Sequence, residues 1–337
     1  MDYKFTGKFK VCAVQAAPAF LNIEQGIEKA IDLIKEAAGN GAQLIAFPEV
    51  WLPGYPWYIW LDSPAGWSKY VQPYYENSLS VESELFDRLC QAAKTYQIHL
   101  VMGFSERAAG TLYISQAFID NHGQLLGVHR KLKPTHVERA VYGEGDGSTL
   151  KVYHTDLGNL GGLCCAEHLQ LFSKYALYAC HEQIHVASWP SFSLYKGLSM
   201  QLSAEANCAA TQVYALEGQA FVLSPCAIVS QEMLDMLCDT EQKRSLLDIG
   251  GGFAQIYGPD GAELCEFLDD KTEGLIYAEI DLASIGVAKA AYDPVGHYSR
   301  PDIFSLHINR NVTERVKTIG SVTTTANIEE NESYVSE

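Results

Sequence analysis

Short apolar runs that fit buried strands alternate with amphipathic runs that fit helices, and this alternation limits the possible folds more than any other feature. Residues 10–17 form an apolar run, residues 22–38 have helical periodicity up to Gly39, and residues 42–47 form a second apolar run. A strand that is apolar throughout must be covered on both faces. The pattern therefore predicts a layered α/β domain with β-sheet inside and helices outside.

The rest of the chain continues this pattern and then becomes richer in strands. Further strands are predicted at residues 98–104, 112–119, 125–130, 151–154, 159–164, 184–188, 219–224, 253–257, 262–266 and 274–280, and further helices at 81–96, 173–181, 200–214 and 282–290. Residues 52–75 are aromatic and proline-rich without a period, which indicates a folded loop over a pocket. We expect one domain over residues 1–310 and a polar, acidic, flexible tail over 311–337.

Charge and cysteine content exclude several classes of partner and compartment. The 337 residues carry a formal net charge of −17, which argues against nucleic acid and membrane surfaces because both attract basic patches. There is no apolar run of about 18 residues that would predict a transmembrane helix, and residues 1–10 are too polar for a secretory signal. The nine cysteines include no C-x-x-C pair, so a reducing, cytoplasmic location is expected.

A thiol at the end of a predicted strand is the first sign of chemistry. The apolar run 157–163 leads directly into Cys164 and Cys165, and a helical stretch begins at Leu171. Side chains alternate along a strand, so Cys164 is expected to point into the core and Cys165 into a cleft. At such a turn the backbone N–H groups that follow can face a developing negative charge. Cys165 is therefore the candidate nucleophile, and the other cysteines are interpreted as packing residues.

Glu49 is the candidate general base. It directly follows the apolar run 42–47, and the carboxyl ends of sheet strands are where ligands bind in α/β proteins. A carboxylate at its normal pKa is a weak base towards a thiol. Burial against Phe47, Trp51 and Tyr55 would raise the pKa of Glu49 into a useful range.

Lys131 and Glu138 complete the candidate set. The ammonium of Lys131 could stabilise a thiolate or the negative atom of an adduct. Glu138 would lie two turns away on the same face if the segment were partly helical, and it could then orient the lysine or a water. Lys131 also stands in a basic cluster that could be a solvated face, and Lys133 is its natural competitor.

One further motif has the spacing of a zinc site. His181 to His185 read H-E-x-x-H, a pattern that binds zinc when both histidines lie one turn apart on a single helix. His185, however, opens the run 186–190, which is predicted to be a strand. The two side chains should therefore diverge, and we predict no metal site here.

Five sequence runs carry a family resemblance: FPEVWLPGYPW, HRKLKPTHVERAVYGEGDG, LGGLCCAEH, HVASWPSF and DPVGHYSRPD. Together they resemble the nitrilase family of carbon–nitrogen hydrolases over residues 8–305, and the run KYALYACHEQIHVASWPSFSLY is most similar to the arylacetonitrilase branch. The resemblance implies a four-layer α-β-β-α sandwich and no metal or organic cofactor. It also implies self-association through the outer helices into dimers that often build spiral oligomers.

The resemblance also implies roles and a reaction. Glu49 matches the base, Lys131 the charge stabiliser, Cys165 the nucleophile and Glu138 the second glutamate of the family. Cys165 would add to a nitrile carbon to give a thioimidate, water would release ammonia and leave a thioester, and a second water would release the carboxylic acid. Expulsion of the thiol from the tetrahedral intermediate would instead release an amide.

The substrate pocket is expected to be largely aromatic. Its predicted residues are Trp51, Tyr55, Trp60, His136, Tyr142, Ala166, Trp189 and Pro190. The chain departs from the family pattern at Ala166, at residues 169–172 and at Tyr142. The small side chain of Ala166 beside the thiol should leave room for a bulky or α-substituted nitrile.

Several functions compete at this stage. The first is a nitrilase acting on arylacetonitriles, with an aliphatic nitrilase or an amidase of the same superfamily as the alternatives. Two hypotheses come from other functional classes. One is a zinc hydrolase that uses His181 and His185, and the other is a non-catalytic assembly protein of the same fold. The runs LPGYPW and KLKPTHVER favour a nitrile substrate.

Overall fold

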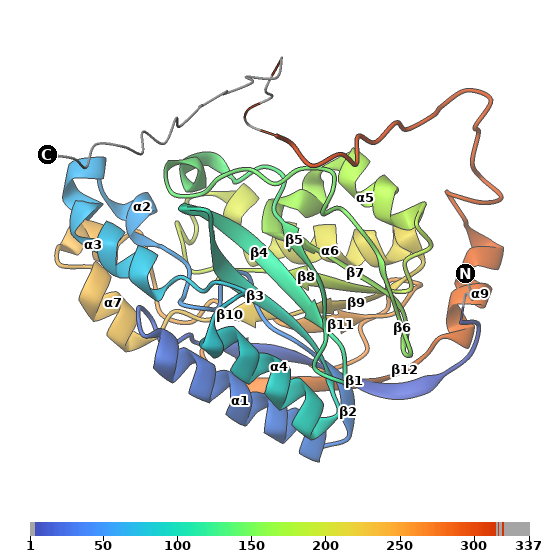
Figure 1. Ribbon diagram of the computed structural model, residues 1–337, viewed down its shortest axis with the longest axis horizontal. Coiled ribbons are helices and arrows are strands. Elements are labelled where there is room, and N and C mark those ends of the chain that lie inside the picture. The colour runs from blue at the N-terminus through green and yellow to red at the C-terminus, as the bar shows by residue number, and fades with distance from the viewer. Residues whose placement is uncertain (1–3, 315, 317–318, 320–337) are drawn as a thin grey trace, which may run out of the picture.

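Two β-sheets pack face to face at the centre of the molecule (Figure 1). The computed structural model describes residues 4–314, 316 and 319. In these residues the first sheet has the strand order β10 (Cys226–Ala227), β1 (Lys8–Ala16), β2 (Ala42–Ala46), β3 (His99–Ala108), β4 (Thr111–Ile119) and β5 (Leu125–Arg130), and β12 (Gly274–Asp281) pairs antiparallel with β1. The parallel pairs β1–β2 and β2–β3 place the carboxyl end of β2 in the middle of this sheet.

The second sheet is smaller and has a parallel centre. Its strand order is β11 (Gln255–Tyr257), β9 (Phe221–Ser224), β8 (Ile184–Ser188), β7 (Gly158–Cys164) and β6 (Tyr153–Thr155). Strands β7, β8 and β9 run parallel, with Gly162 opposite Val186. Every residue of β7 and β8 is buried, as expected for strands that are covered on both faces.

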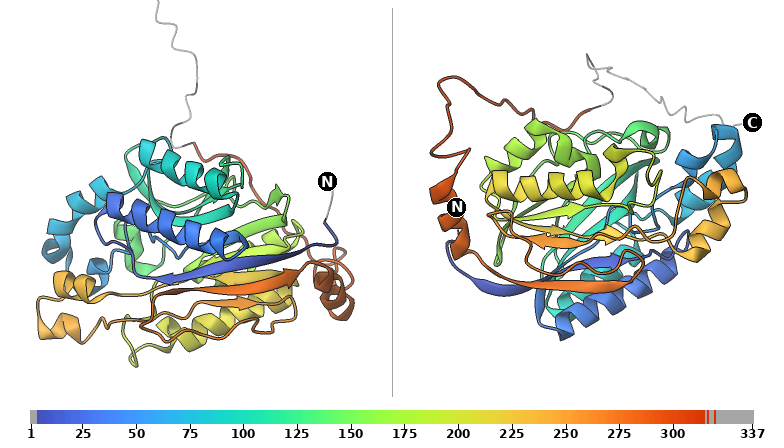
Figure 2. Two further views of the ribbon diagram at one scale, coloured as in Figure 1. Left: turned by 90° about the horizontal axis from the view of Figure 1, so that it is seen from below. Right: turned by 180° about the vertical axis from the view of Figure 1, so that it is seen from behind.

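Helices form the two outer layers. Helices α1 (Ile23–Gly39) and α4 (Glu84–Tyr96) cover the first sheet, and α5 (Leu171–Tyr178) and α6 (Ala204–Gly218) cover the second (Figures 1 and 2). The side chains of Asn22, Ser83 and Ser203 accept hydrogen bonds from backbone N–H groups in the first turns of α1, α4 and α6. The predicted four-layer α-β-β-α sandwich is therefore confirmed.

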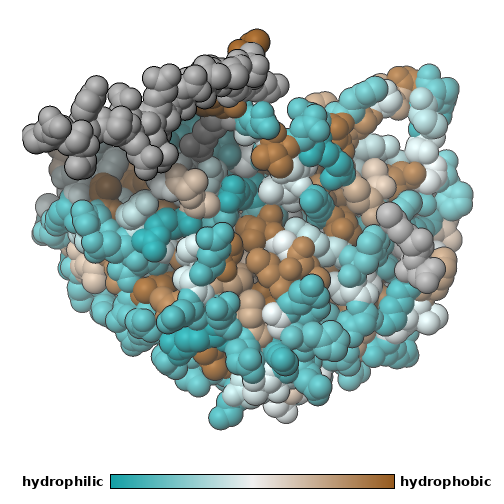
Figure 3. Space-filling view, in the orientation of Figure 1, coloured by the Kyte–Doolittle hydropathy of each residue, from teal (hydrophilic) through white to brown (hydrophobic). Residues whose placement is uncertain are grey.

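Apolar side chains fill the space between the two sheets. Val11 and Leu44 of the first sheet belong to the same buried cluster as Leu163 and Val186 of the second. Because both sheets bury their inner faces in this layer, the ends of β2 and β7 are held in fixed relation to each other. The outer face in view in Figure 3 is mostly hydrophilic, with scattered hydrophobic patches.

A helical lobe lies at one end of the sandwich, and it corrects the prediction for residues 52–75. These residues contain α2 (Tyr58–Leu61) and α3 (Pro64–Asn77) and are not an irregular loop. Proline at the first helical position fits a helix start, and the aromatic residues on both faces hid the helical period. The lobe also contains α7 (Gln231–Leu237) and α8 (Glu241–Arg244), which sequence analysis missed. Tyr70 donates to the carbonyl of Met236 at 2.9 Å, which joins α3 to α7.

The C-terminal third brings a second correction. Residues 262–266, all within the described part of the chain, form only the isolated bridge between Tyr257 and Glu263 and not a strand. A tight turn around Gly258 and Gly261 returns the chain for a single pairing before it moves away. Helix α9 (Ala283–Ala291) lies where it was predicted.

The predicted tail over 311–337 lies outside the described residues, apart from 311–314, 316 and 319. Among the described helices, none is long and apolar enough to span a bilayer.

Candidate active site

Cys165 stands where β7 ends and the short 3₁₀ helix η2 (Cys165–Leu169) begins. Its φ of 47° lies in the left-handed region, which costs a residue with a side chain about 1–3 kcal/mol. This turn directs the side chain of Cys165 into a cavity of about 740 Å³. Cys164 has its side chain in an apolar cluster of the core, so the two neighbouring thiols face different surroundings, as predicted.

The cavity collects most of the predicted pocket residues. Tyr55, Trp60, His136, Ala166, Trp189 and Pro190 line it, together with Glu138 and Cys165. Sequence analysis missed other lining residues, among them Trp57, Phe192, Leu194, Tyr195, Leu202 and Asn207. The rings of Trp60 and His136 stack with centroids 5.4 Å apart, and the Tyr195 hydroxyl donates to the Trp60 carbonyl at 2.8 Å. These contacts fix one aromatic wall of the cavity.

Two of the predicted pocket residues lie elsewhere. Trp51 is buried beneath α1, and its indole N–H donates to the carbonyl of Ala16 at 3.0 Å. Tyr142 is buried in the lobe, where its hydroxyl hydrogen-bonds to that of Tyr74. The prediction of Trp51 and Tyr142 as lining residues is therefore wrong. Val50 has a φ of 47°, and the chain turns there, so nearness to Glu49 in sequence does not bring Trp51 to the cavity.

Glu49 lies three residues beyond the end of β2 and is 1% exposed. Its backbone N–H donates to the carbonyl of Trp189 at 3.2 Å, which ties the end of β2 to the end of β8. Both of its carboxylate oxygens accept from the ammonium of Lys131, at 3.4 and 3.3 Å. Glu49 and Lys131 therefore meet across the first sheet, at the ends of β2 and β5.

Lys131 is also fully buried, and it has a second carboxylate partner. Its ammonium donates to Glu138 at 2.9 Å, and Glu138 also accepts from the hydroxyl of Tyr55 at 2.7 Å. The competitor Lys133 is exposed and pairs with Glu144 at the surface. The structure therefore brings Lys131, and not Lys133, into the site.

The backbone between Lys131 and Glu138 is not one helical face. Only residues His136–Ala140 form a 3₁₀ helix, η1. Glu138 reaches Lys131 because the chain turns back after it, with His136 at a φ of 48° and the N–H of Thr135 bound to the Glu138 carboxylate. The predicted meeting of the two side chains holds, but the geometry assumed for it does not.

Burial sets the electrostatics of this group. Burial, with a smaller contribution from the Glu138 charge, raises the pKa of Glu49 to about 8 against the opposing charge of Lys131. Burial alone would lower the pKa of Lys131, but the two carboxylates hold it well above its ordinary value. Burial and the Glu49 charge raise the pKa of the Cys165 thiol. The resting thiol is therefore protonated, and it needs a base when it attacks.

A second buried carboxylate, Glu167, was not predicted. It accepts from the N–H groups of Cys164 and Leu132, each at 2.9 Å, and from the His129 ring at 3.0 Å. It thereby joins the turn that carries the thiol to the segment that carries the lysine. Burial alone would raise the pKa of Glu167, but the His129 charge and these hydrogen bonds lower it. The sequence signal was the acidic residue placed three residues after a mostly apolar strand.

The H-E-x-x-H motif has the divergent geometry that was predicted. His185 is on strand β8, whereas His181 is exposed and follows α5. The two ring nitrogens of His185 contact Glu182 at 2.8 Å and His168 at 2.9 Å. In the described part of the chain, no group of three or more His, Cys, Asp or Glu side chains is placed to hold a metal ion.

Comparison with known proteins agrees with this geometry. The carbon–nitrogen hydrolase family matches residues 10–290. The chain is 55% identical to a nitrilase of Pseudomonas syringae pv. syringae (strain B728a), over 90% of each chain. It is 50% identical to an aliphatic nitrilase of Rhodococcus rhodochrous, over 94% of this chain and 86% of the relative. It is also 50% identical to an arylacetone-specific nitrilase of Alcaligenes faecalis, over 87% of this chain and 82% of the relative.

A solved structure shares the fold at much lower identity. The carbon–nitrogen hydrolase of Helicobacter pylori G27 superimposes with a TM-score of 0.69 at 18% identity, over 88% of this chain and 97% of the other. The family matches most of the chain, and the chain has high identity to named nitrilases over most of their length. This chain belongs to the carbon–nitrogen hydrolase family and, within it, to the nitrilases.

Proposed function

We propose that this enzyme hydrolyses nitriles to carboxylic acids and ammonia, with Cys165 as the nucleophile. The observation that carries the proposal is the convergence of Glu49, Lys131 and Glu138 in one buried charge group that acts on the Cys165 thiol. A thiol is a soft nucleophile suited to a nitrile carbon, and the group supplies both a base and a positive charge. The steps need only these side chains and water.

In the first step the sulfur of Cys165 bonds to the nitrile carbon. Glu49, in its carboxylate form, takes the thiol proton and passes it to the nitrile nitrogen, which gives a neutral thioimidate. Lys131 stabilises the negative charge that develops on that nitrogen, because its ammonium is fixed in a water-poor site. Glu138 holds Lys131 in place at 2.9 Å and is itself fixed by Tyr55.

Two water molecules complete the turnover. The first adds to the thioimidate carbon to give a tetrahedral intermediate, which loses ammonia and leaves a thioester. The second releases the carboxylic acid and returns the proton to sulfur. If the tetrahedral intermediate loses the thiol instead, the product is an amide. Glu49 carries the proton at each step, which suits a carboxyl whose pKa is raised to about 8.

The cavity lining favours a nitrile that carries an aryl group. The stacked pair Trp60 and His136, with Trp189 and Phe192, offers aromatic surfaces on which a ring can pack. Ala166 leaves space beside the thiol for a substituent on the neighbouring carbon. Relatives at 50% identity are named for both aliphatic and arylacetone substrates, so the lining is the basis for proposing arylacetonitriles.

A substrate panel tests the activity and the specificity together. Phenylacetonitrile, benzonitrile, an aliphatic nitrile and phenylacetamide are compared for ammonia, acid and amide release. We expect phenylacetonitrile to give the highest kcat/KM. Turnover of phenylacetamide without turnover of any nitrile would replace the proposal with an amidase. A preference for the aliphatic nitrile would reject the arylacetonitrile assignment alone.

The two adjacent thiols provide a matched pair of variants for the same assay. Cys165→Ala is expected to abolish acid and amide release, because no other group can form the covalent adduct. Cys164→Ser should retain much of the activity, since its side chain faces the core. Full activity in Cys165→Ala would reject the mechanism.

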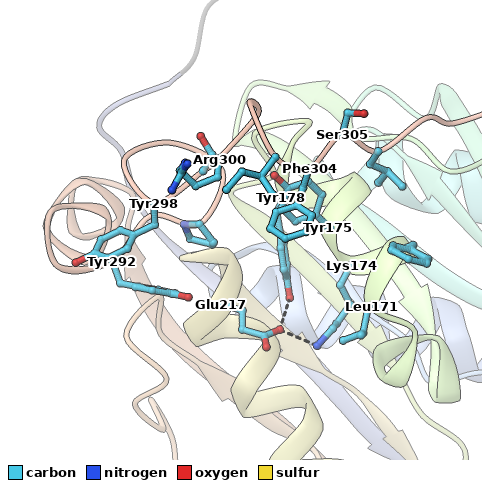
Figure 4. A pocket seen from close by; sticks show the side chains of 15 residues that line it. Leu171, Lys174, Tyr175, Tyr178, Glu217, Tyr292, Tyr298, Arg300, Phe304 and Ser305 are labelled. Carbon is cyan, nitrogen blue, oxygen red and sulfur yellow. Dashed lines mark hydrogen bonds and ion pairs between the residues drawn. The ribbon is translucent and has the colours of Figure 1, made fainter.

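We also propose that the chain associates with itself through the face formed by α5 and α6. Leu171 and Phe172 on this face are 70% and 76% exposed, and large apolar side chains that cluster at a surface mark interaction sites. A cavity of about 720 Å³ lies beside them, against the segment that contains Tyr298 and Phe304 (Figure 4). Lys174 and Tyr178 point to Glu217 at its floor. A second copy would cover these apolar residues.

Analytical ultracentrifugation tests the self-association directly. The double variant Leu171→Lys/Phe172→Glu should lower the sedimentation coefficient relative to the wild type. The same two changes at exposed Val71 and Met236 in the helical lobe, which do not line this cavity, serve as the control. Equal assembly in all three proteins would reject the α5–α6 face.

We propose a cytoplasmic location on the basis of the cysteines. All nine are free thiols in the structure, which suits a reducing compartment.

A further inference from the structure

A chain of four buried side chains runs from the nucleophile to the outer helix α6. A ring nitrogen of His168, Nδ1, lies 2.7 Å from the carbonyl oxygen of Cys165. The other nitrogen of His168, Nε2, lies 2.9 Å from Nε2 of His185. Nδ1 of His185 lies 2.8 Å from Glu182, whose second oxygen accepts from the hydroxyl of Tyr214 at 2.6 Å. None of the four side chains is more than 2% exposed.

The chemistry of the end group fixes the direction of every hydrogen bond in this chain. A carbonyl oxygen can only accept, so His168 donates its Nδ1–H to Cys165. Nε2 of neutral His168 must then accept, and His185 donates to it. Nδ1 of neutral His185 accepts in turn, which requires Glu182 to carry a proton and donate it. Each donor thus meets one acceptor, and no charge is needed inside the core.

The pKa values of these groups agree with a neutral chain. Burial raises the pKa of Glu182 to about 8, so its carboxyl holds a proton at neutral pH. Burial, together with the neighbouring His185, lowers the pKa of His168 to about 3. Burial also holds the pKa of His185 well below its ordinary value. Both rings are therefore neutral.

The carbonyl that receives this chain belongs to a strained residue. Cys165 has a φ of 47°, so its peptide group is not held by the ordinary strand or helix geometry. Its carbonyl is fixed instead by the His168 donor. The His168 ring is held in turn between Trp189, at a centroid distance of 5.2 Å, and Tyr214, at 5.5 Å.

We propose that His168 is a positioning residue, oriented by His185, Glu182 and Tyr214, which holds the Cys165 backbone so that the thiol faces the nitrile. This inference rests on the proposed nitrile hydrolysis. It gives a role in that reaction to side chains that are not themselves reacting groups. It also gives a role to Glu182 and His185 of the H-E-x-x-H motif, which hold the nucleophile in place.

Two substitutions at His168 separate this role from plain packing. His168→Asn keeps an N–H donor close to the position of Nδ1, whereas His168→Leu has similar bulk and no donor. Both variants leave the His185 N–H without its acceptor, so both should lose stability to a similar extent. If the bond to the Cys165 carbonyl positions the thiol, only the leucine variant should lose kcat, by about 100-fold, with KM nearly unchanged.

Alkylation of Cys165 by iodoacetamide provides a readout that does not depend on nitrile turnover. Measured in the Cys164→Ser background and followed by mass spectrometry, the rate should fall in His168→Leu and recover in His168→Asn. Equal kcat values and equal alkylation rates in the two folded variants would overturn the proposal. A wild-type protein that hydrolyses no nitrile would remove the proposed function, while the alkylation result would still decide the role of His168.

If neither His168 variant folds, the same contrast is available at Glu182, two side chains further along this hydrogen-bonded series. Glu182→Gln can donate to His185 and accept from Tyr214, as the protonated carboxyl does, so its alkylation rate should match the wild type. Glu182→Leu can do neither, and its rate should fall. Equal rates in the two Glu182 variants would likewise overturn the proposal.

Discussion

Glu49 and Glu167 are two fully buried carboxyl groups of one site, yet their pKa values move in opposite directions. Glu49 has the Lys131 ammonium as its hydrogen-bond donor, at 3.3 Å, and shares that charge with Glu138. Glu167 receives two backbone N–H groups and His129, at 2.9–3.0 Å. Burial prevails for the first carboxyl and raises its pKa, whereas for the second the His129 charge and the hydrogen bonds together outweigh burial and lower its pKa. The number of donors therefore separates a carboxyl that can exchange protons from one that holds the backbone.

The strongest test of this contrast is Glu49→Gln. The amide can neither take nor return a proton, so kcat should fall by about 10²–10⁴-fold. Thermal stability should stay equal or rise, because a poorly solvated carboxyl is removed. Steady-state kinetics and a melting curve measure both quantities, with exposed Glu144→Gln as the control. Retained activity would remove Glu49 from the proposed mechanism.

Lys131→Arg tests the ammonium that donates to the Glu49 carboxylate. The planar guanidinium cannot replace a compact ammonium between two carboxylates, and a lost transition-state donor costs about 10²–10³-fold in kcat. Lys133→Arg, at the exposed neighbouring lysine, is the matched control and should behave as the wild type. Equal kcat in both variants would show that the charge alone is sufficient.

Glu167→Gln should act mainly on stability. An amide nitrogen would face a backbone N–H, and His129 would lose its counter-charge, so we expect a loss of about 3 kcal/mol in the free energy of unfolding. Urea denaturation measures this loss. A variant as stable as the wild type would mean that Glu167 does not hold the two segments together.

The pH dependence of activity follows from the raised pKa of Glu49. Since the base must be ionised to take the thiol proton, kcat/KM should fall about tenfold per pH unit below the folded pKa of about 8. A pH–rate profile with phenylacetonitrile measures the midpoint of this acid limb. A midpoint near the ordinary carboxyl value would contradict the desolvation of Glu49.

Glu49 and Glu167 should also make the free energy of unfolding change with pH in opposite directions. Folding raises the pKa of Glu49 from 4.5 to about 8, so the folded state binds this proton more tightly and stability falls as pH rises across that interval. Folding lowers the pKa of Glu167, so its contribution is present above its ordinary value and is lost as pH falls through the folded value. Each effect is at most about 1.4 kcal/mol per pH unit.

Urea midpoints between pH 3 and pH 9 measure both slopes. Glu49→Gln should reduce the alkaline decline, to which Glu182 with its raised pKa also contributes, and Glu167→Gln should reduce the acid decline. If the two variants changed the same limb of the curve, the comparison between the two carboxyl groups would be wrong.

The sequence predicted the structure correctly where the residue pattern indicates burial or the end of a strand. The apolar runs 42–47 and 157–163 could only be buried strands, so Glu49 and Cys165 had to follow strand ends. The placement of sheet inside and helices outside followed from the same pattern, whereas the four-layer order was implied by the family resemblance. These inferences needed no knowledge of which distant segments touch.

It failed where a single backbone angle decides the outcome. The positive φ at Val50 takes Trp51 away from the cavity, and nothing in the local sequence announces it. The helices within residues 58–77 were not predicted, because aromatic side chains occupy both their inner and outer faces and mask the helical period. Glu167 and His168 were missed because their partners His129 and His185 lie on two strands that are distant in sequence, β5 and β8.

Val50, His136 and Cys165 each adopt a left-handed backbone conformation beside a group of the site. Glycine would relieve that strain at exposed His136, whereas at buried Val50 it would leave a cavity and at Cys165 it would remove the nucleophile. The relaxed backbone at position 136 would then be free to turn the adjoining side chains away. An engineer who ranks variants by melting temperature alone would therefore be led, at this position, towards a more durable and less active enzyme.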